Sequence, residues 1–102
     1  MFLYNVTVGI DKEIEQDWVV WIKQNYIPAI LATGFFRESK LYRIVTPDDE
    51  HSVSYSIQLF ADKIEQVVEY LNQHTGTIIE THRLKFKDQH VIFNTLLDGV
   101  FQ

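Results

Sequence analysis

Hydrophobic and polar positions alternate along four stretches of the chain with the two-residue period of a β-strand. These stretches cover residues 2–9, 35–46, 52–60 and 89–97. In the third stretch, the large apolar side chains fall on one face, opposite serines and a glutamine. That strand is therefore expected to bury one face and to leave the other open.

Two longer stretches, residues 11–32 and 62–86, follow the 3.6-residue period of an α-helix. Asp11 is expected to cap the first helix, and Gly34 to end it. Pro28 has no N–H to donate to the carbonyl of Gln24, so the helix is expected to kink or restart there. Its apolar stripe consists of Ile14, Trp18, Trp21, Ile22 and Tyr26.

The second helical stretch carries two start signals. Asp62 with Glu65 predicts a capping box, and Thr77 with Glu80 predicts another directly after Gly76. We therefore expect a bend at Gly76, with two nearly collinear pieces because the apolar stripe keeps its phase. The core positions before the bend are Ile64, Val67, Val68 and Leu71.

The order of these elements predicts a single α+β domain over residues 1–102, a βαββαβ unit. Right-handed connections give a four-stranded antiparallel sheet in the order 4-1-3-2, with the helices on one face. This is the ferredoxin-like fold.

Composition excludes several classes of protein. Nine basic residues against 14 acidic ones give a net charge of −5, which argues against a nucleic-acid partner. The absence of cysteine excludes disulfides and thiolate metal sites. The acidic loop at 47–50 lacks calcium-loop spacing and predicts a hairpin turn. We expect no metal and no cofactor.

No apolar run reaches the roughly 18 residues of a membrane span, and the first residues show no secretion signal. A cytoplasmic protein without membrane contact is expected.

The two predicted edge strands are apolar on both faces, and edges of this kind invite a partner. The chain also ends on apolar residues after an Asp98-Gly99 turn. We therefore predict a homodimer whose sheets face one another and could close a barrel of the dimeric α+β type. The expected interface residues are Val91, Phe93, Leu97, Val100 and Phe101.

Several segments resemble a known family. They are residues 4–8, the Trp18-x-x-Trp21 pair, residues 27–34 and residues 94–97. Together they are similar to a family of small bacterial proteins, frequent in Bacteroidetes and classed as a domain of unknown function. The resemblance implies a dimeric α+β-barrel or ferredoxin-like fold and assigns no activity. Tyr26 stands where that family often has a histidine.

The candidate functional residues are few. His82, in the middle of an apolar stripe, is either an acid/base or haem or metal ligand facing a cavity, or an interior histidine tied to a backbone carbonyl. Asn5 and Asn94 either bind a substrate across the sheet or pair with each other or a partner chain. The aromatic side chains that either wall a ligand pocket or fill the core are Tyr4, Trp18, Tyr26 and Tyr55.

Two functions therefore stay open. The first is a non-catalytic or regulatory dimer that binds a small molecule or a protein. The second is a small oxygenase or isomerase, cofactor-free or haem-dependent, acting on an apolar or aromatic substrate. Its acid/base would be His82, with Asn5 and Asn94 orienting the substrate. An open cavity at His82 would favour the second function, and a filled space the first.

Overall fold

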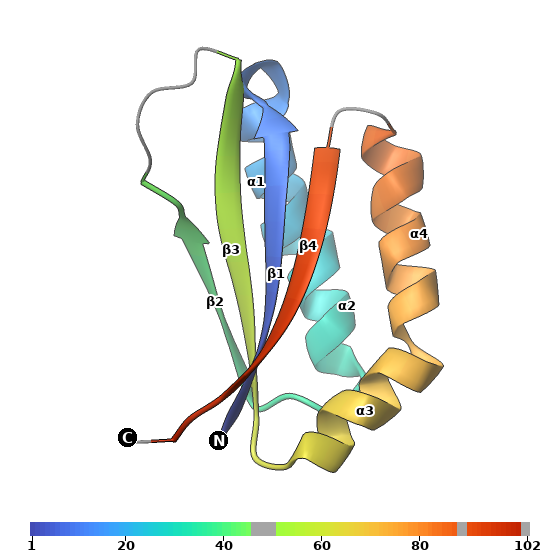
Figure 1. Cartoon of the computed structure of the whole chain (residues 1–102). Coiled ribbons are helices and arrows are strands. Elements are labelled where there is room, and N and C mark those ends of the chain that lie inside the picture. Colours follow the sequence, from blue (N-terminus) through green and yellow to red (C-terminus); the bar gives the residue numbers. More distant parts are fainter. Residues whose placement is uncertain (46–50, 88–89, 101–102) are drawn as a thin grey trace.

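The computed structural model describes residues 1–45, 51–87 and 90–100. Its strands form one antiparallel sheet in the order β2-β3-β1-β4 (Figure 1). The strands are β1 (Phe2–Asp11), β2 (Glu38–Arg43), β3 (Ser52–Ala61) and β4 (His90–Asp98). The predicted ferredoxin-like α+β fold and its strand order are confirmed, and the turn predicted at 47–50 lies outside the described residues.

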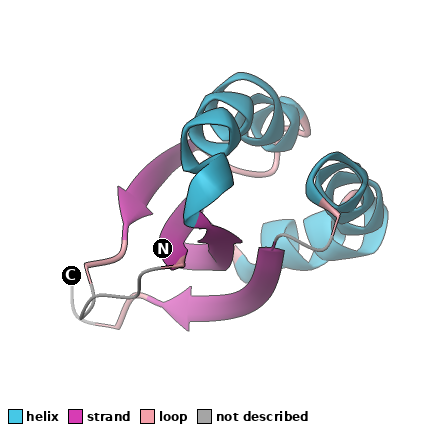
Figure 2. Ribbon diagram, turned by 90° about the horizontal axis from the view of Figure 1, so that it is seen from above, coloured by secondary structure: helices cyan, strands magenta, loops and turns pink. Residues whose placement is uncertain are grey.

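The helices lie on one side of the twisted sheet, and the other side is open (Figure 2). The chain passes from β1 through a 3₁₀ turn, η1 (Lys12–Ile14), into α1 (Glu15–Trp21), the π-helical η2 (Ile22–Tyr26) and α2 (Ile27–Ala32). The second helical region comprises α3 (Ile64–Gln73) and α4 (Thr75–Phe86).

Asp11 is the N-cap residue of the 3₁₀ turn η1, as predicted, but the first α-helix begins later. This residue still pairs with Ser52 as the end of β1, and its side chain makes no capping hydrogen bond. The sheet ladder holds the backbone extended there, so the first α-helix begins only at Glu15.

The break expected at Pro28 is confirmed, and it takes the form of a π-helical turn. The N–H of Ile27 reaches back to the carbonyl of Ile22, and Pro28 then occupies the first turn of α2. That first turn tolerates a residue without an N–H. Gly34, at a φ of 83°, ends the helix as predicted, and its N–H donates to the carbonyl of Leu31 at 3.1 Å.

The second helical region bends at His74 rather than at Gly76. His74 has the non-helical angles φ −125° and ψ −28°, while Gly76 has no positive φ and lies in the first turn of α4. The His74 ring packs against Phe35 and Tyr70 at centroid distances of 5.7 and 6.3 Å. Tertiary packing therefore sets the position of the bend.

The expectation of two collinear pieces is wrong. In Figure 1, α3 lies across one end of the sheet and α4 rises from it at a clear angle. In α3, Val67 and Tyr70 are in the core, whereas Val68 and Leu71, which were expected there, are exposed.

The capping signals of this region are also displaced. At the start of α3, the side-chain carbonyl of Gln66, rather than Glu65, accepts the N–H groups of Asp62 and Lys63 at 3.1 and 3.0 Å. In α4, the expected box of Thr77 and Glu80 does not form; Thr77 instead accepts the hydroxyl of Thr81 at its backbone carbonyl.

Strand β2 is shorter than the predicted 35–46. Phe36 turns into the core and packs against Tyr70 with ring centroids 5.0 Å apart, so the regular strand begins only at Glu38.

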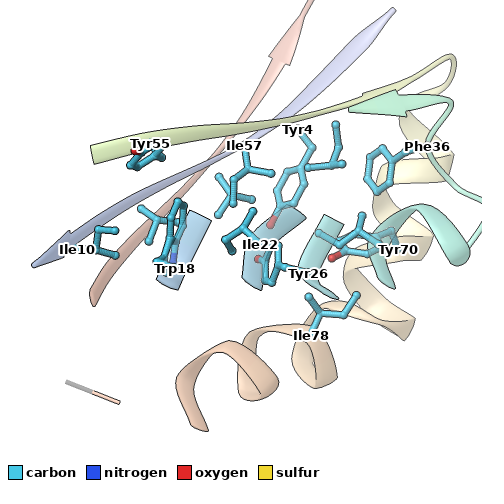
Figure 3. Close-up of a cluster of buried hydrophobic side chains, with 14 of the residues drawn as sticks. Tyr4, Ile10, Trp18, Ile22, Tyr26, Phe36, Tyr55, Ile57, Tyr70 and Ile78 are labelled. Atoms are coloured by element: carbon cyan, nitrogen blue, oxygen red, sulfur yellow. The ribbon is translucent and has the colours of Figure 1, made fainter. Parts of the chain in front are cut away.

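The core fills the space between the sheet and the helices (Figure 3). Every second residue of the two central strands faces the helices and is buried, as the alternation predicts. From the first helical region, Trp18, Ile22, Tyr26 and Ile30 complete this cluster.

Candidate functional site

His82 lies at the centre of the helical layer, where it has no solvent-exposed surface. It projects from α4 into a ring of aromatic side chains from both helical regions and from β4. The ring centroids of these neighbours lie 4.6 to 6.4 Å from its own; they are His90, Phe86, Trp21, Tyr26 and Trp18.

One hydrogen bond fixes the state of this histidine. The Nε1–H of Trp18 donates to Nε2 of His82 at 2.9 Å, so Nε2 carries the lone pair and the proton of the neutral ring is on Nδ1. Nδ1 has no hydrogen-bond partner within the described part of the chain. The backbone hydrogen bond expected for a structural histidine is therefore replaced by a side-chain bond from the opposite helix.

The protein environment keeps the ring neutral. Burial, with a contribution from nearby His90, lowers the pKa of His82 from 6.5 to about 4. A base of this pKa that solvent does not reach is poorly suited to proton transfer at neutral pH. In this position His82 serves as the acceptor that holds the Trp18 indole.

The four aromatic candidates belong to the core, and of them Tyr26 also lines the small recess described below. Tyr4, Trp18, Tyr26 and Tyr55 are all buried, and Figure 3 shows them between the sheet and the helices. Burial raises the pKa of the Tyr26 hydroxyl. Trp18 and Tyr55 pack together with ring centroids 4.9 Å apart.

The hydroxyl of Tyr55 joins a small ionic network. It donates to a carboxylate oxygen of Glu15, which also accepts the Nε–H of Arg43 at 3.0 Å. Burial and the bond to Glu15 raise the pKa of Tyr55 to about 12, and the same bond lowers the pKa of Glu15. The network connects α1 to β2 and β3 through Glu15, Arg43 and Tyr55.

Asn5 and Asn94 lie on opposite faces of the sheet, so they do not pair with each other. Asn94 is the register partner of Val6, which faces the helices, while Asn5 points to the open face. The structure therefore does not bring His82, Asn5 and Asn94 into one site.

The open face of the sheet has a polar centre. On β1, the Nδ2 of Asn5 donates to the hydroxyl of Thr7 at 2.8 Å. From β3, the hydroxyl of Ser56 donates to the Asn5 side-chain carbonyl, and Gln58 donates to Ser56 at 3.3 Å. We call these four residues the polar ladder.

Apolar side chains flank the polar ladder on the edge strands. Val91, Phe93 and Leu97 of β4 face the open side, and they are 56%, 64% and 46% exposed. Tyr42 of β2 is exposed on the same face. Val100 follows β4 and is also exposed, while Phe101 lies outside the described residues.

A groove of about 430 Å³ separates α1 and η2 from α4. Trp21 and Phe86 form its aromatic wall, and Asp17, Gln24, Asn25 and Lys85 are its polar residues. A smaller, mainly apolar recess of about 50 Å³ shares Trp21 and Asn25 with the groove. His82 lines neither cavity; Trp21, which lines both, packs against it with ring centroids 5.7 Å apart.

The helical periodicity alone did not reveal this groove. It placed Trp21 in the core stripe, whereas the side chain is only half-buried. The sequence feature that could have indicated the groove is Pro28. The π-helical turn before it carries Gln24 and Asn25, and π-helical turns occur often at functional sites.

Within the described ranges, no cluster of three or more histidine, aspartate or glutamate side chains is arranged to hold a metal ion. In the same ranges, no helix is long and apolar enough to cross a membrane.

Comparisons with known proteins agree with this architecture. A family described as a domain of unknown function, DUF4286, matches residues 1–100, so the chain belongs to that family. No curated protein is detectably similar to it in sequence.

Solved structures share the fold at low sequence identity. An ethyl tert-butyl ether D (EthD) family protein of Bacillus halodurans has a TM-score of 0.67 and 14% identity, covering 98% of this chain and 100% of its own. A protein of Arabidopsis thaliana has a TM-score of 0.64 and 10% identity, with 98% and 99% covered. A dabb family protein with a ferredoxin-like fold from Mesorhizobium loti has a TM-score of 0.52 and 15% identity, with 97% and 100% covered. At these identities the likeness concerns the fold alone.

Proposed function

We propose that this member of the DUF4286 family is a non-catalytic binding domain that acts as a symmetric homodimer joined through the open faces of its sheets. The observation that carries the proposal is the open face itself. Its edge strand β4 exposes three large apolar side chains beside a polar centre. Several large exposed apolar side chains on one strand face are typical of protein interfaces.

A second copy of the same chain suits this face for two reasons. In an isologous contact, each polar ladder can offer its side-chain amides and hydroxyls to the other across the two-fold axis. The apolar flank would also be covered. Burying Val91, Phe93 and Leu97 is worth about 1.5–3 kcal/mol for each side chain before the costs of association.

The absence of a catalytic role is proposed from the state of His82. The ring is sealed by aromatic neighbours, its Nε2 is engaged by Trp18, and its low pKa keeps it neutral. A general base must come within hydrogen-bond reach of its substrate, directly or through one water. The buried ring supports the binding hypothesis over the enzymatic one.

The competing hypothesis is a dimeric α+β-barrel enzyme of the oxygenase or isomerase type with an apolar or aromatic substrate. The fold shared with an EthD family protein and the groove between the helices favour it. It would require a reacting group in the groove other than His82.

Light scattering over a dilution series tests the assembly. We expect twice the 12.0 kDa monomer mass at micromolar concentration. A protein that stays monomeric under these conditions contradicts the dimer. Native mass spectrometry of the purified protein tests the second part, because a copurifying haem or flavin would favour the enzyme.

A further inference from the structure

We propose that the groove between α1–η2 and α4 binds an uncharged, flat aromatic molecule with an amide-like polar edge. The proposal gives a ligand to the binding role proposed above, and it does not depend on the dimer. It follows from the wall, the hydrogen-bonding groups, the charge and the size of the groove.

The wall of the groove is a supported aromatic surface. The indole of Trp21 packs edge-on against Phe86, with ring centroids 5.3 Å apart. Behind it, Tyr26 and His82 lie 6.0 and 5.7 Å away, centroid to centroid, and both are buried. A half-buried indole held by three rings is already ordered, so a stacked ligand loses little affinity to ordering of the site.

Hydrogen-bonding groups surround this wall. No described residue accepts a hydrogen bond from the Nε1–H of Trp21, whereas the other tryptophan of the chain donates to His82. Asn25 donates from its Nδ2 to the Trp21 backbone carbonyl at 3.4 Å, which leaves its side-chain oxygen able to accept. Gln24 adds a second amide. A ligand edge with one acceptor and one donor, such as a primary carboxamide, matches these groups.

The charge of the groove argues for a neutral ligand. Among the described residues that line it, the charged ones are Asp17 and Lys85, which have opposite signs. Their formal charges cancel, so the groove has no net charge that would favour an anion or a cation over a neutral ligand.

The size of the groove agrees with a small ring compound. Its 430 Å³ lies within the range of small-molecule sites. The recess beyond Trp21 is lined by Tyr26, Ala29 and Ile78, and it offers apolar contacts to a ring substituent.

The chain contains two tryptophans, so NMR of the indole N–H groups provides the test with an internal control. Benzamide serves as the probe, with benzoate and benzylammonium as its charged counterparts. We expect benzamide to shift the Trp21 indole resonance with saturation and to leave the sealed Trp18 resonance unchanged. The charged probes should bind at least several-fold more weakly. The spectrum of Trp21→Phe assigns the two signals.

The Trp21→Phe variant also tests the hydrogen bond, since it keeps an aromatic wall and removes the N–H. Ligand-observed titration should show benzamide binding weakened about tenfold, the effect of one lost hydrogen bond. Tyr42→Phe, on the far side of the sheet, is the matched control and should bind as the unchanged chain does.

Three results would overturn the proposal: no shift of the Trp21 signal up to the solubility limit of benzamide, equal shifts of both indoles, or tighter binding of a charged probe. Light scattering on the same samples separates the two proposals, because a dimer with a silent groove overturns this inference alone.

Discussion

The two faces of the sheet carry different kinds of surface and have different consequences. On the two central strands, the helix-facing side carries buried aromatic and aliphatic side chains, and His82, which packs in the same layer, is buried and neutral. The open side has a hydrogen-bonded polar centre and exposed apolar residues toward its edges. The first face supplies the buried core, and the second is the surface through which the proposed dimer would form.

The difference is sharpest between two aromatic residues. Trp18 is fully buried and its one polar atom is satisfied by His82. Phe93 has no polar atom and remains 64% exposed in the single chain. Exposed apolar area is costly in water, and the dimer proposed above would cover this side chain.

The strongest test of the helix-facing side is His82→Ala. The change opens a cavity among five rings and leaves the buried Trp18 N–H without its acceptor, so we expect the free energy of unfolding to fall by about 3–4 kcal/mol. Chemical denaturation measures it. Leu84→Ala, two residues along α4 at a 60% exposed position, is the control and should change stability by less than about 0.5 kcal/mol. A loss below about 1 kcal/mol for His82→Ala would mean that the site is not tightly packed.

A second test uses pH. The pKa of His82 is lower in the folded chain, about 4, than its ordinary value of 6.5, so folding favours the neutral ring. The contribution of the neutral His82 ring to the free energy of unfolding is therefore fully present above pH 6.5 and is lost as the pH falls toward 4. The free energy of unfolding should then decrease by about 3 kcal/mol between these pH values.

The control for the pH experiment is His82→Gln, which cannot titrate. The pKa of Glu15 is also lowered in the folded chain, so the stability that its carboxylate contributes is lost in acid as well. This loss is the same in both proteins and cancels in the difference between their pH profiles. Identical pH profiles for the two proteins would show that the ring is reached by solvent or protonated in the folded state.

The open face is tested by Phe93→Asp. A carboxylate in the proposed interface should weaken dimerisation about 100-fold, or roughly 2.7 kcal/mol, and leave the monomer folded. Sedimentation or light scattering measures the change. Leu96→Asp is the matched control, because it lies on the same strand, is 43% exposed and faces the helices. If both variants dissociate the dimer equally, the interface is not the open face.

The smallest expected effects concern two glycines at helix ends. An added Cβ at Gly76 meets no atom within 4 Å and the residue has no positive φ, so Gly76→Ala should stabilise the chain by about 0.5 kcal/mol. Gly34 has a φ of 83°, so Gly34→Ala should destabilise it by about 1 kcal/mol. Thermal unfolding of the two variants shows whether each substitution raises or lowers the stability. If Gly76→Ala instead destabilises the chain, the bend lies at Gly76 rather than at His74.

The sequence by itself determined the strands, their order and the buried face. Alternation in the central strands and the stripe through Trp18, Ile22 and Tyr26 specified which side chains are buried, because apolar periodicity directly reflects which side of an element avoids water. The helix stop at Gly34 and the break before Pro28 were also predictable, since both depend on local backbone chemistry.

The tertiary structure decided what depends on distant contacts. Packing of His74 on Phe35 and Tyr70 moved the bend away from Gly76. The pairing of Asp11 with Ser52 left the first α-helix to begin only at Glu15. The sequence also could not show that Trp18 would meet His82, 64 residues away, or that Asn5 and Asn94 would face opposite sides. Register and helix packing fix these relations, and local patterns contain no information about which residues from distant segments meet.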